Sequence, residues 1–265
     1  MDYKNSLIIT SIRTIKNEGP KRFIKYHFFY IMKFKLDYVK DLLLFEKLKF
    51  NPNKNKYFIG QNNNDINKVF DYANKYKVFT PSIRPAQLKS EFVKFSNLLK
   101  SEKIKNVLEI GTANGGTLYL FSRIINKNGM IVSLDWVHPK WKQNFYKSFA
   151  LSKQQIFLVS GNSHKKQNLE KVKKIIGNKK FDMLFIDGDH SYMGVKSDFD
   201  MYKSLVKNGG IIAFHDIAAG YIINPRWADV NKFWMQLKRK YKYVEIIEDK
   251  NKQRAFGIGV IYYKV

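Results

Sequence analysis

The stretch Val107-Leu-Glu-Ile-Gly-Thr-Ala-Asn-Gly-Gly-Thr117 decides the fold that we expect for this chain. Its apolar run predicts a buried strand, the glycines at 111, 115 and 116 predict a tight turn, and the helical pattern from Thr117 predicts a helix. Backbone N–H groups in such a strand, turn and helix face a ligand. The glycine spacing differs from the Gly-x-Gly-x-x-Gly fingerprint of dinucleotide sites, so the pattern does not favour NAD.

The composition is that of a folded protein without cysteine chemistry. Of the 265 residues, 45% are hydrophobic and 15% are aromatic, and the lack of cysteine excludes disulfides and thiolate nucleophiles. The chain begins without the cationic stretch and long apolar core of a signal peptide. The longest apolar run in its N-terminal region, residues 28–32, is far shorter than the ~18 residues of a spanning helix. We therefore expect a cytoplasmic protein.

The formal net charge of +26 comes almost entirely from lysine, since the chain has only seven arginines. Proteins that read nucleic-acid bases favour arginine, because it makes bidentate contacts with base edges. We therefore expect no specific nucleic-acid partner. A general affinity for anionic surfaces is compatible with the charge.

Residues 1–78 predict a helical extension that precedes an α/β domain of residues 79–265. A short helix over residues 6–17 is followed by Pro20, which opens a second helix that runs to about Lys49. The second helix mixes aromatic and lysine side chains, and two interpretations stay open. It packs on the domain or on a second subunit of a homo-oligomer, or it lies as a basic amphipathic helix on the anionic inner face of a membrane.

From residue 80 onward, predicted strands and helices alternate. Strands are expected at residues 107–110, 130–136, 155–160, 181–187 and 209–214, and helices at 86–99, 117–125, 139–151, 165–176 and 191–207. A helix at 226–241 and two strands at 243–248 and 257–263, joined by a polar turn, complete the chain. The alternation predicts an α/β fold with a Rossmann-like, doubly wound, mainly parallel seven-stranded sheet and a C-terminal antiparallel hairpin.

Acids and histidines gather at the carboxyl ends of these strands, where parallel sheets bind their ligands. Four consecutive strands are followed by Asp135 and His138, by Ser163 and His164, by Asp187, Asp189 and His190, and by His215 and Asp216. A single histidine in a loop is usually just solvated. Because four of the five histidines in the chain lie along one edge of the sheet, we expect at least one of them to have a function.

Asp135 and Trp136 indicate a ligand that contains adenosine. An acid at the end of the second strand, about 20 residues beyond a glycine turn, accepts hydrogen bonds from ribose hydroxyls. Trp136 offers an aromatic face for an adenine, and the turn lacks the lysine of a Walker motif, which disfavours ATP. A nucleoside with an amino-acid tail fits better. The ammonium and carboxylate of the tail would meet Asp187 or Glu109 and the turn amides or Thr117.

These motifs resemble class I S-adenosylmethionine (SAM)-dependent methyltransferases. The resemblance covers residues 80–265 and rests on Val107–Thr117, Ile131-Val-Ser-Leu-Asp135, Gly161-Asn-Ser-His164, Phe185-Ile-Asp-Gly-Asp-His-Ser-Tyr192 and Gly209-Gly-Ile-Ile-Ala-Phe-His-Asp216. Within the class, the motifs are similar to the small-molecule and sugar O-methyltransferase branch. That branch includes cephalosporin-hydroxylase-like, rhamnosyl and macrolide-sugar enzymes.

The resemblance implies SAM as the cofactor and a set of residues that hold it. These residues are Glu109, Gly111, Thr112, Ala113, Gly115, Thr117, Asp135, Trp136, Asn162, Ser163 and Asp187. Several relatives hold a divalent cation, and the resemblance implies a site for Mg²⁺ or another divalent ion at Asp187, His215 and Asp216. The chain departs from its relatives at His215, where they often have an acid, and this departure leaves metal binding open.

The expected reaction is methyl transfer from SAM to a hydroxyl of a sugar, a glycan or another small polyol, with His190 or His215 as the base. Two alternatives stay open, a membrane-surface protein with an inactive methyltransferase-like domain and a nucleic-acid methyltransferase. The retained acids of the cofactor set, together with His190, argue against the first alternative. The lack of an Asn/Asp-Pro-Pro-Tyr-like tetrapeptide argues against the second. No stretch of the chain identifies the acceptor.

Overall fold

The computed structural model describes residues 65–75, 83–218, 229–249, 253 and 256–264, all of which belong to one compact unit. The predicted N-terminal helices, residues 219–228 and so the first residues of the helix predicted at 226–241 lie outside the described residues. The membrane and subunit contacts proposed for the N-terminal helices therefore stay predictions. Within the described ranges, no helix is long and apolar enough to cross a membrane.

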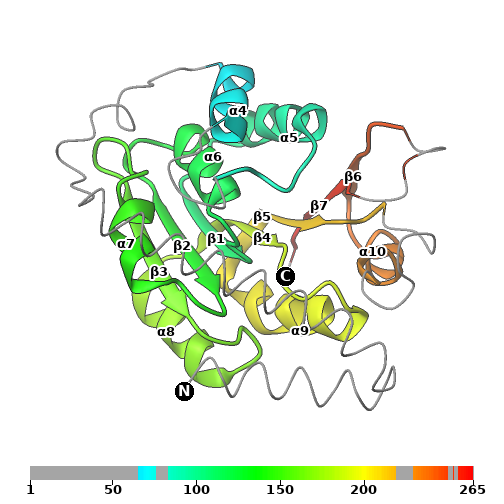
Figure 1. The fold of residues 1–265 in the computed structure, drawn as a ribbon. Helices are drawn as coiled ribbons and strands as arrows, with labels where there is room; N and C mark the ends of the chain where they lie inside the picture. Colours follow the sequence, from blue (N-terminus) through cyan, green and yellow to red (C-terminus); the bar gives the residue numbers. More distant parts are fainter. Residues whose placement is uncertain (1–64, 76–82, 219–228, 250–252, 254–255, 265) are drawn as a thin grey trace, which may run out of the picture. The chain divides into compact units, whose positions relative to one another are not determined.

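Seven strands form one sheet in the order β3-β2-β1-β4-β5-β7-β6 (Figure 1). Their bounds are β1 Asn106–Ile110, β2 Met130–Asp135, β3 Gln155–Ser160, β4 Phe181–Ile186, β5 Val206–His215, β6 Tyr243–Ile246 and β7 Ile258–Tyr262. Strands β1 to β5 pair in parallel, and β7 runs antiparallel between β5 and β6. The predicted doubly wound sheet and its C-terminal hairpin are confirmed.

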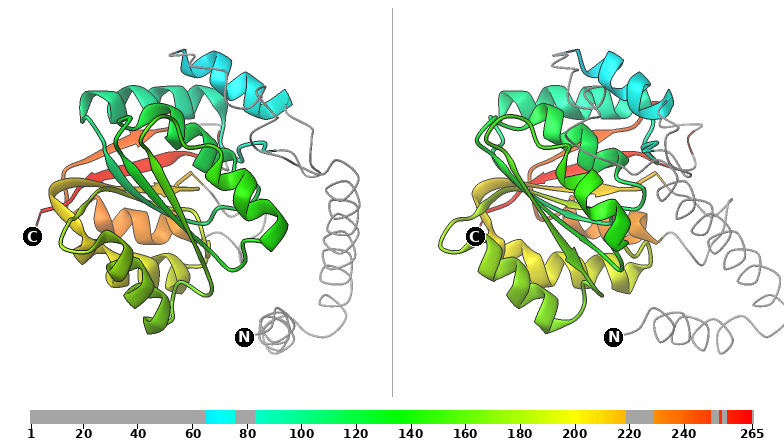
Figure 2. Two further views of the ribbon diagram at one scale, coloured as in Figure 1. Left: turned by 90° about the vertical axis from the view of Figure 1, so that its left-hand side faces the viewer. Right: turned by 60° about the vertical axis from the view of Figure 1, so that its left-hand side comes forward.

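Helices cover both faces of the sheet (Figure 2). One face carries α5 (Lys89–Ser101), α6 (Gly116–Ile124) and α7 (Lys140–Lys147), and the other carries α8 (Lys166–Ile176), α9 (Tyr192–Tyr202) and α10 (Val230–Leu237). Helix α4 (Ile66–Lys75) packs on α5 and α6 and belongs to the same compact unit as the sheet. The predicted domain boundary near residue 78 falls within residues 76–82, outside the described residues, and stays a prediction.

The junction between α9 and β5 differs from the prediction. Helix α9 ends at Tyr202, the short 3-10 helix η1 (Lys203–Leu205) follows, and β5 begins at Val206. The sequence predicts a helix to about residue 207 and a strand from residue 209. Val206 pairs with Phe181 on the far side of a register shift between β4 and β5, so pairing within the sheet extends the strand beyond its apolar run.

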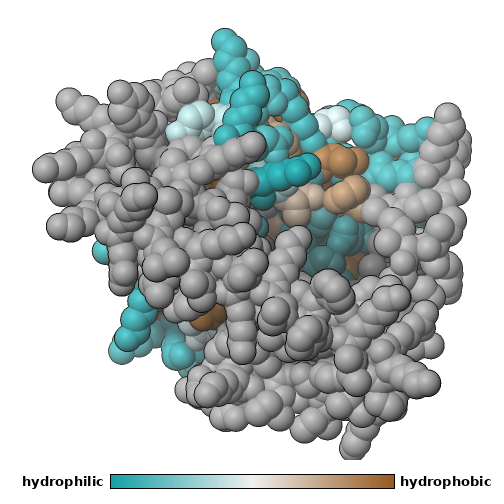
Figure 3. Space-filling model, viewed as in Figure 1, coloured by the Kyte–Doolittle hydropathy of each residue, from teal (hydrophilic) through white to brown (hydrophobic). Residues whose placement is uncertain are grey.

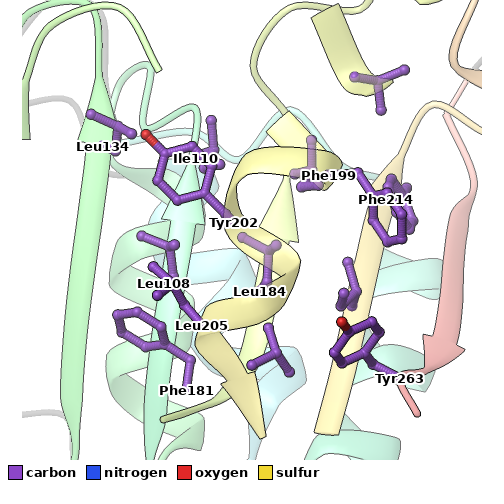
Figure 4. Close-up of a cluster of buried hydrophobic side chains, with 14 of the residues drawn as sticks. Leu108, Ile110, Leu134, Phe181, Leu184, Phe199, Tyr202, Leu205, Phe214 and Tyr263 are labelled. Atoms are coloured by element: carbon purple, nitrogen blue, oxygen red, sulfur yellow. The ribbon is translucent and has the colours of Figure 1, made fainter. Parts of the chain in front are cut away.

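The core explains why β1 and β4 are nearly unbroken apolar runs. Both strands lie inside the sheet and are covered on both faces. Leu108, Leu184 and Tyr202 belong to the core cluster between the sheet and α9 (Figure 4), and Phe121 packs edge-on against Phe185 on the opposite face. The strand order reverses between β1 and β4, so a ligand crevice is expected at the carboxyl ends of these two strands.

On the face drawn in Figure 3, hydrophilic residues surround a small hydrophobic area. Large exposed hydrophobic side chains among the described residues are Trp136, Met193, Met235 and Tyr243. Trp136 directly follows β2, which places it at the same edge of the sheet as the expected crevice.

Candidate active site

The glycine turn and the acid after β4 meet where the strand order reverses. The N–H of Asp187 donates a hydrogen bond to the carbonyl oxygen of Ile110 at 2.8 Å. A Cβ atom on Gly111 would stand 2.0 Å from the carbonyl oxygen of Asp187. Gly111 also has a φ of +96°, so its backbone conformation and its close approach to Asp187 both require glycine.

Asp135 holds the glycine turn from the end of β2. Its Oδ2 accepts hydrogen bonds from the backbone N–H groups of Thr112 at 2.7 Å and Ala113 at 2.9 Å. Its Oδ1 makes one long contact, 3.5 Å from the N–H of Val137. Trp136, the next residue along the chain, is 52% exposed. Asp135 therefore supports the turn with one carboxylate oxygen and has capacity on the other for a ligand hydroxyl.

The loop after β3 is held by contacts with α9 and by its own turn. Asn162 Oδ1 accepts a hydrogen bond from the N–H of His164 at 2.8 Å, and the carbonyl oxygen of Ser163 accepts one from the Tyr202 hydroxyl at 2.8 Å. His164 Nε2 lies 3.2 Å from a carboxylate oxygen of the buried Asp198, and this pairing raises the pKa of His164. His164 therefore anchors the loop that carries the predicted cofactor residues Asn162 and Ser163.

Glu109, Thr112 and Thr117, which were predicted to contact the cofactor, are buried around the glycine turn. Glu109 is 0% exposed and accepts a hydrogen bond from the Ser133 hydroxyl at 2.5 Å. The Thr112 hydroxyl lies 2.5 Å from Ser133 Oγ and 3.0 Å from His138 Nε2. Burial raises the pKa of Glu109 to about 8 and lowers the pKa of His138. This buried polar chain supports the glycine turn from beneath.

Two acids and two histidines form a cluster at the ends of β4 and β5. His190 Nε2 lies 3.3 Å from Asp187 Oδ1, and His190 Nδ1 lies 2.8 Å from Asp216 Oδ2. His215 Nδ1 lies 3.1 Å from Asp187 Oδ1 and 3.4 Å from Asp216 Oδ1. Both imidazoles are therefore shared between the same two carboxylates.

The group that could hold a metal differs from the predicted set. Asp187, His190 and Asp216 each offer one ligand atom, and these atoms all lie within 4.8 Å of one another. The predicted set contained His215 in place of His190. The His190 side chain is 37% exposed between the carboxylates, whereas that of His215 is 3% exposed.

The charges of the cluster are set by these contacts. Burial alone would raise the pKa of Asp187, but His215 and His190 outweigh burial and hold it well below its usual range. Burial lowers the pKa of His190, but its contacts with Asp187 and Asp216 outweigh burial and raise it to about 10. The same two acids raise the pKa of His215 against the effect of burial. His215 Nε2 is buried and has no hydrogen-bond partner in the part of the chain that the structure describes.

The backbone at Asp216 is strained. Asp216 and Phe256 both have a φ of +63°, in the left-handed region that non-glycine residues rarely adopt. The N–H of Phe256 donates a hydrogen bond to Asp216 Oδ1 at 3.2 Å, and the N–H of Ala218 donates one to the carbonyl oxygen of Phe256 at 2.9 Å. Such conformations cost about 1–3 kcal/mol each and concentrate at functional sites, which supports a functional role for Asp216.

Gln87 contacts the site and Glu91 holds the segment next to Phe256, although no sequence motif contains either residue. Gln87 Nε2 donates a hydrogen bond to Asp187 Oδ2 at 2.8 Å. Glu91 accepts hydrogen bonds from the N–H of Gly257 at 3.0 Å and from Gln253 Nε2 at 2.5 Å. The only signal in the sequence that could have found Gln87 and Glu91 is their i, i+4 spacing beside the apolar face of the predicted helix.

Comparison with known families decides what kind of domain carries this cluster. A family model described as a methyltransferase domain matches residues 108–217. The matched range contains the glycine turn, Asp135 and the whole acid–histidine cluster. Residues 108–217 therefore form a methyltransferase domain. Gln87 lies outside the matched methyltransferase domain and reaches Asp187 from the preceding segment.

Solved structures of O-methyltransferases share the fold of this chain. TomG from Streptomyces achromogenes, involved in tomaymycin synthesis and solved in complex with SAM, has a TM-score of 0.52 and 15% identity over 76% of this chain and 90% of its own. The O-methyltransferase from Bacillus cereus, in complex with SAH, has a TM-score of 0.52 and 17% identity over 84% of this chain and 96% of its own.

A short sequence match links the chain to a viral protein. Uncharacterized protein R132 of Acanthamoeba polyphaga mimivirus is 54% identical over 35 residues. The match spans 13% of this chain and 16% of that protein, so most of both chains lies outside it.

Proposed function

We propose that this methyltransferase transfers the methyl group of SAM to a hydroxyl oxygen. The observation that carries the proposal is His215, whose Nδ1 faces Asp187 and Asp216 while its Nε2 has no hydrogen-bond partner among the described residues. A carboxylate that accepts a hydrogen bond from the Nδ1–H of a histidine holds the ring in the tautomer whose Nε2 carries a lone pair. A histidine held in this way suits the removal of a proton from an acceptor hydroxyl.

The glycine turn and Asp135 form the proposed donor site. Backbone N–H groups at the start of α6 suit the carboxylate of the donor. Asp135 Oδ1 suits the ribose hydroxyls, and the exposed face of Trp136 suits the adenine. Asn162 and Ser163 would border the adenine from the loop after β3. The SAM and SAH complexes of the two structures with this fold support the choice of donor.

In the proposed reaction, the acceptor oxygen attacks the methyl carbon of SAM while the carbon–sulfur bond breaks. The products are a methyl ether and S-adenosylhomocysteine (SAH), and the hydroxyl proton passes to His215 Nε2. The protein contributes alignment of the two reactants and acceptance of the proton. His190 is less suited to this task, because both of its nitrogens contact carboxylates, whereas His215 Nε2 has no hydrogen-bond partner among the described residues.

A divalent cation fits the same cluster. Asp187 and Asp216 supply carboxylate oxygens and His190 supplies an imidazole nitrogen. This mixed set suits Mn²⁺, Fe²⁺ or Zn²⁺ better than Mg²⁺, which prefers oxygen ligands. When bound, such a cation acts as a Lewis acid that lowers the pKa of an acceptor hydroxyl. His190 in its imidazolium form is the alternative means of neutralising the two acids.

We propose a sugar, a glycan or another small polyol as the acceptor. The support is the similarity of Phe185–Tyr192 and Gly209–Asp216 to the sugar O-methyltransferase branch. A polyol also suits a cluster of carboxylates and imidazoles, because neighbouring hydroxyls can donate to several of them at once.

Methyl-labelled SAM, offered with monosaccharides, sugar nucleotides and glycans, tests the proposal by mass spectrometry of the products. We expect transfer to a hydroxyl by the wild-type protein and none by His215→Ala, which should still bind SAH in calorimetry. Transfer of the label only to nucleic acid or protein would refute the acceptor class. Failure of the wild-type protein to bind SAH would refute the donor.

A further inference from the structure

A segment outside the matched domain lies against the proposed donor site. A Cβ atom on Gly116, the first residue of α6, would meet the backbone nitrogen of Pro85 at 2.6 Å and the carbonyl carbon of Arg84 at 2.8 Å. The backbone before α5 therefore contacts the end of the glycine turn directly. A side chain at position 116 would push this segment away, because both of the atoms it would meet are backbone atoms.

Gln87 extends from this segment to Asp187. It is 5% exposed, and its Nε2 donates a hydrogen bond to Asp187 Oδ2 at 2.8 Å. The chemistry fixes the orientation of the amide, since the reverse orientation would set a carbonyl oxygen against a carboxylate. The other end of the amide, Oε1, is buried and has no hydrogen-bond partner among the residues that the structure describes. A buried acceptor in this state is unfavourable unless a ligand supplies a donor.

Asp187 has little capacity left for the ammonium group of a ligand. Its Oδ1 already faces His190 Nε2 at 3.3 Å and His215 Nδ1 at 3.1 Å, and its Oδ2 accepts from Gln87. Glu109, the other acid expected near the ammonium, is 0% exposed beneath the turn. Glu109 Oε1 and Gln87 Oε1 both lack a hydrogen-bond partner among the described residues, and of the two only Gln87 is joined directly to Asp187 by a hydrogen bond.

We propose that Gln87 Oε1 accepts a hydrogen bond from the α-ammonium group at the amino-acid end of the donor. The inference rests on the proposed function, because it takes SAM as the donor. Asp187 orients the amide through Nε2 and adds negative charge close to the ammonium, while it keeps its contacts with both histidines. Gln87 is then a donor-binding residue that the chain supplies from outside the methyltransferase domain.

Calorimetry with two probes tests this assignment. SAH retains the ammonium and carboxylate groups, whereas 5′-methylthioadenosine retains only the nucleoside and its thioether. Gln87→Leu should weaken SAH binding about tenfold or more and change methylthioadenosine binding by less than about twofold. Gln87→Met, which is closer to glutamine in shape, should give the same pattern. Gln155→Leu, the same replacement at an exposed position of β3, should change neither affinity.

Each remaining outcome overturns the inference in a recognisable way. Equal weakening of both probes by Gln87→Leu and Gln87→Met would show a general disturbance of the site. Unchanged SAH binding with a raised KM for the acceptor would assign Oε1 to the acceptor hydroxyl. If the wild-type protein binds neither probe, the donor itself is wrong, and this result differs from a failure at Gln87 alone.

Discussion

Replacing Glu109 by glutamine should change the pH dependence of folding stability. Glu109 is buried inside the sheet, and burial raises its pKa from 4.5 to about 8 in the folded protein. The folded state therefore binds the proton more tightly than the unfolded state does. The free energy of unfolding therefore falls as the pH rises from 4.5 through about 8. Glu109→Gln carries no such proton and removes the loss.

The pKa difference sets the size of the effect. A rise from 4.5 to about 8 corresponds to about 5 kcal/mol at 1.36 kcal/mol per pH unit, and about 4 kcal/mol of this falls between pH 5 and pH 9. The amide introduced by Glu109→Gln would bury an additional N–H group beside Ser133, which costs about 1–3 kcal/mol at every pH. This cost cancels when the variant is compared with the wild type at two pH values.

Urea unfolding of both proteins at pH 5 and pH 9 measures the effect. The stability of Glu109→Gln relative to the wild type should rise by about 4 kcal/mol between the two pH values. Glu170→Gln, the same replacement at an exposed position of α8, is the matched control and should show no comparable rise. A relative stability of Glu109→Gln that stays constant from pH 5 to pH 9 would refute the placement of Glu109 as a buried, protonated acid.

Three further changes test the site. Asp135→Ala should weaken SAH binding in calorimetry by about 1.5–3 kcal/mol, because charge-assisted bonds to ribose and to the turn amides are lost, and an unchanged Kd would contradict the ribose assignment. If a cation serves the reaction, chelator should abolish methyl transfer and added Mn²⁺ should restore it. The Asp216→Ala variant should then be inactive yet able to bind SAH. Full activity in chelator would instead leave His190 as the group that neutralises the two acids. Gly116→Ala should lower the free energy of unfolding by about 1–3 kcal/mol in urea and should weaken SAH binding, because the Cβ of the new alanine would meet the backbone of Pro85. Wild-type stability and binding would contradict this contact.

The fold was predictable because its signals are local. A short apolar run followed by glycine, an acid or histidine indicates each parallel strand. Strands β1 and β4 lack alternation of polar and apolar residues, because both of their faces are buried. The start of β5 could not be predicted in the same way. Val206 is a strand residue because Phe181 pairs with it across a register shift, and pairing of this kind depends on residues far apart in the sequence.

The strand-end rule found the right edge of the sheet but could not assign tasks to the residues along it. It predicted a common place for Asp187, His190, His215 and Asp216, and the structure brings these four together. It could not distinguish them from His164, which anchors a loop to α9.

The geometry of individual nitrogen and oxygen atoms makes the remaining distinctions. His190 has both nitrogens on carboxylates, whereas His215 has one nitrogen without a partner among the described residues, and only this contrast separates a charge-neutralising residue from a base. The same reasoning applies to Gln87, a single polar residue just before the amphipathic helix α5. Its importance comes from a 2.8 Å hydrogen bond to Asp187, 100 residues away, and from the carbonyl oxygen that this bond leaves for a ligand.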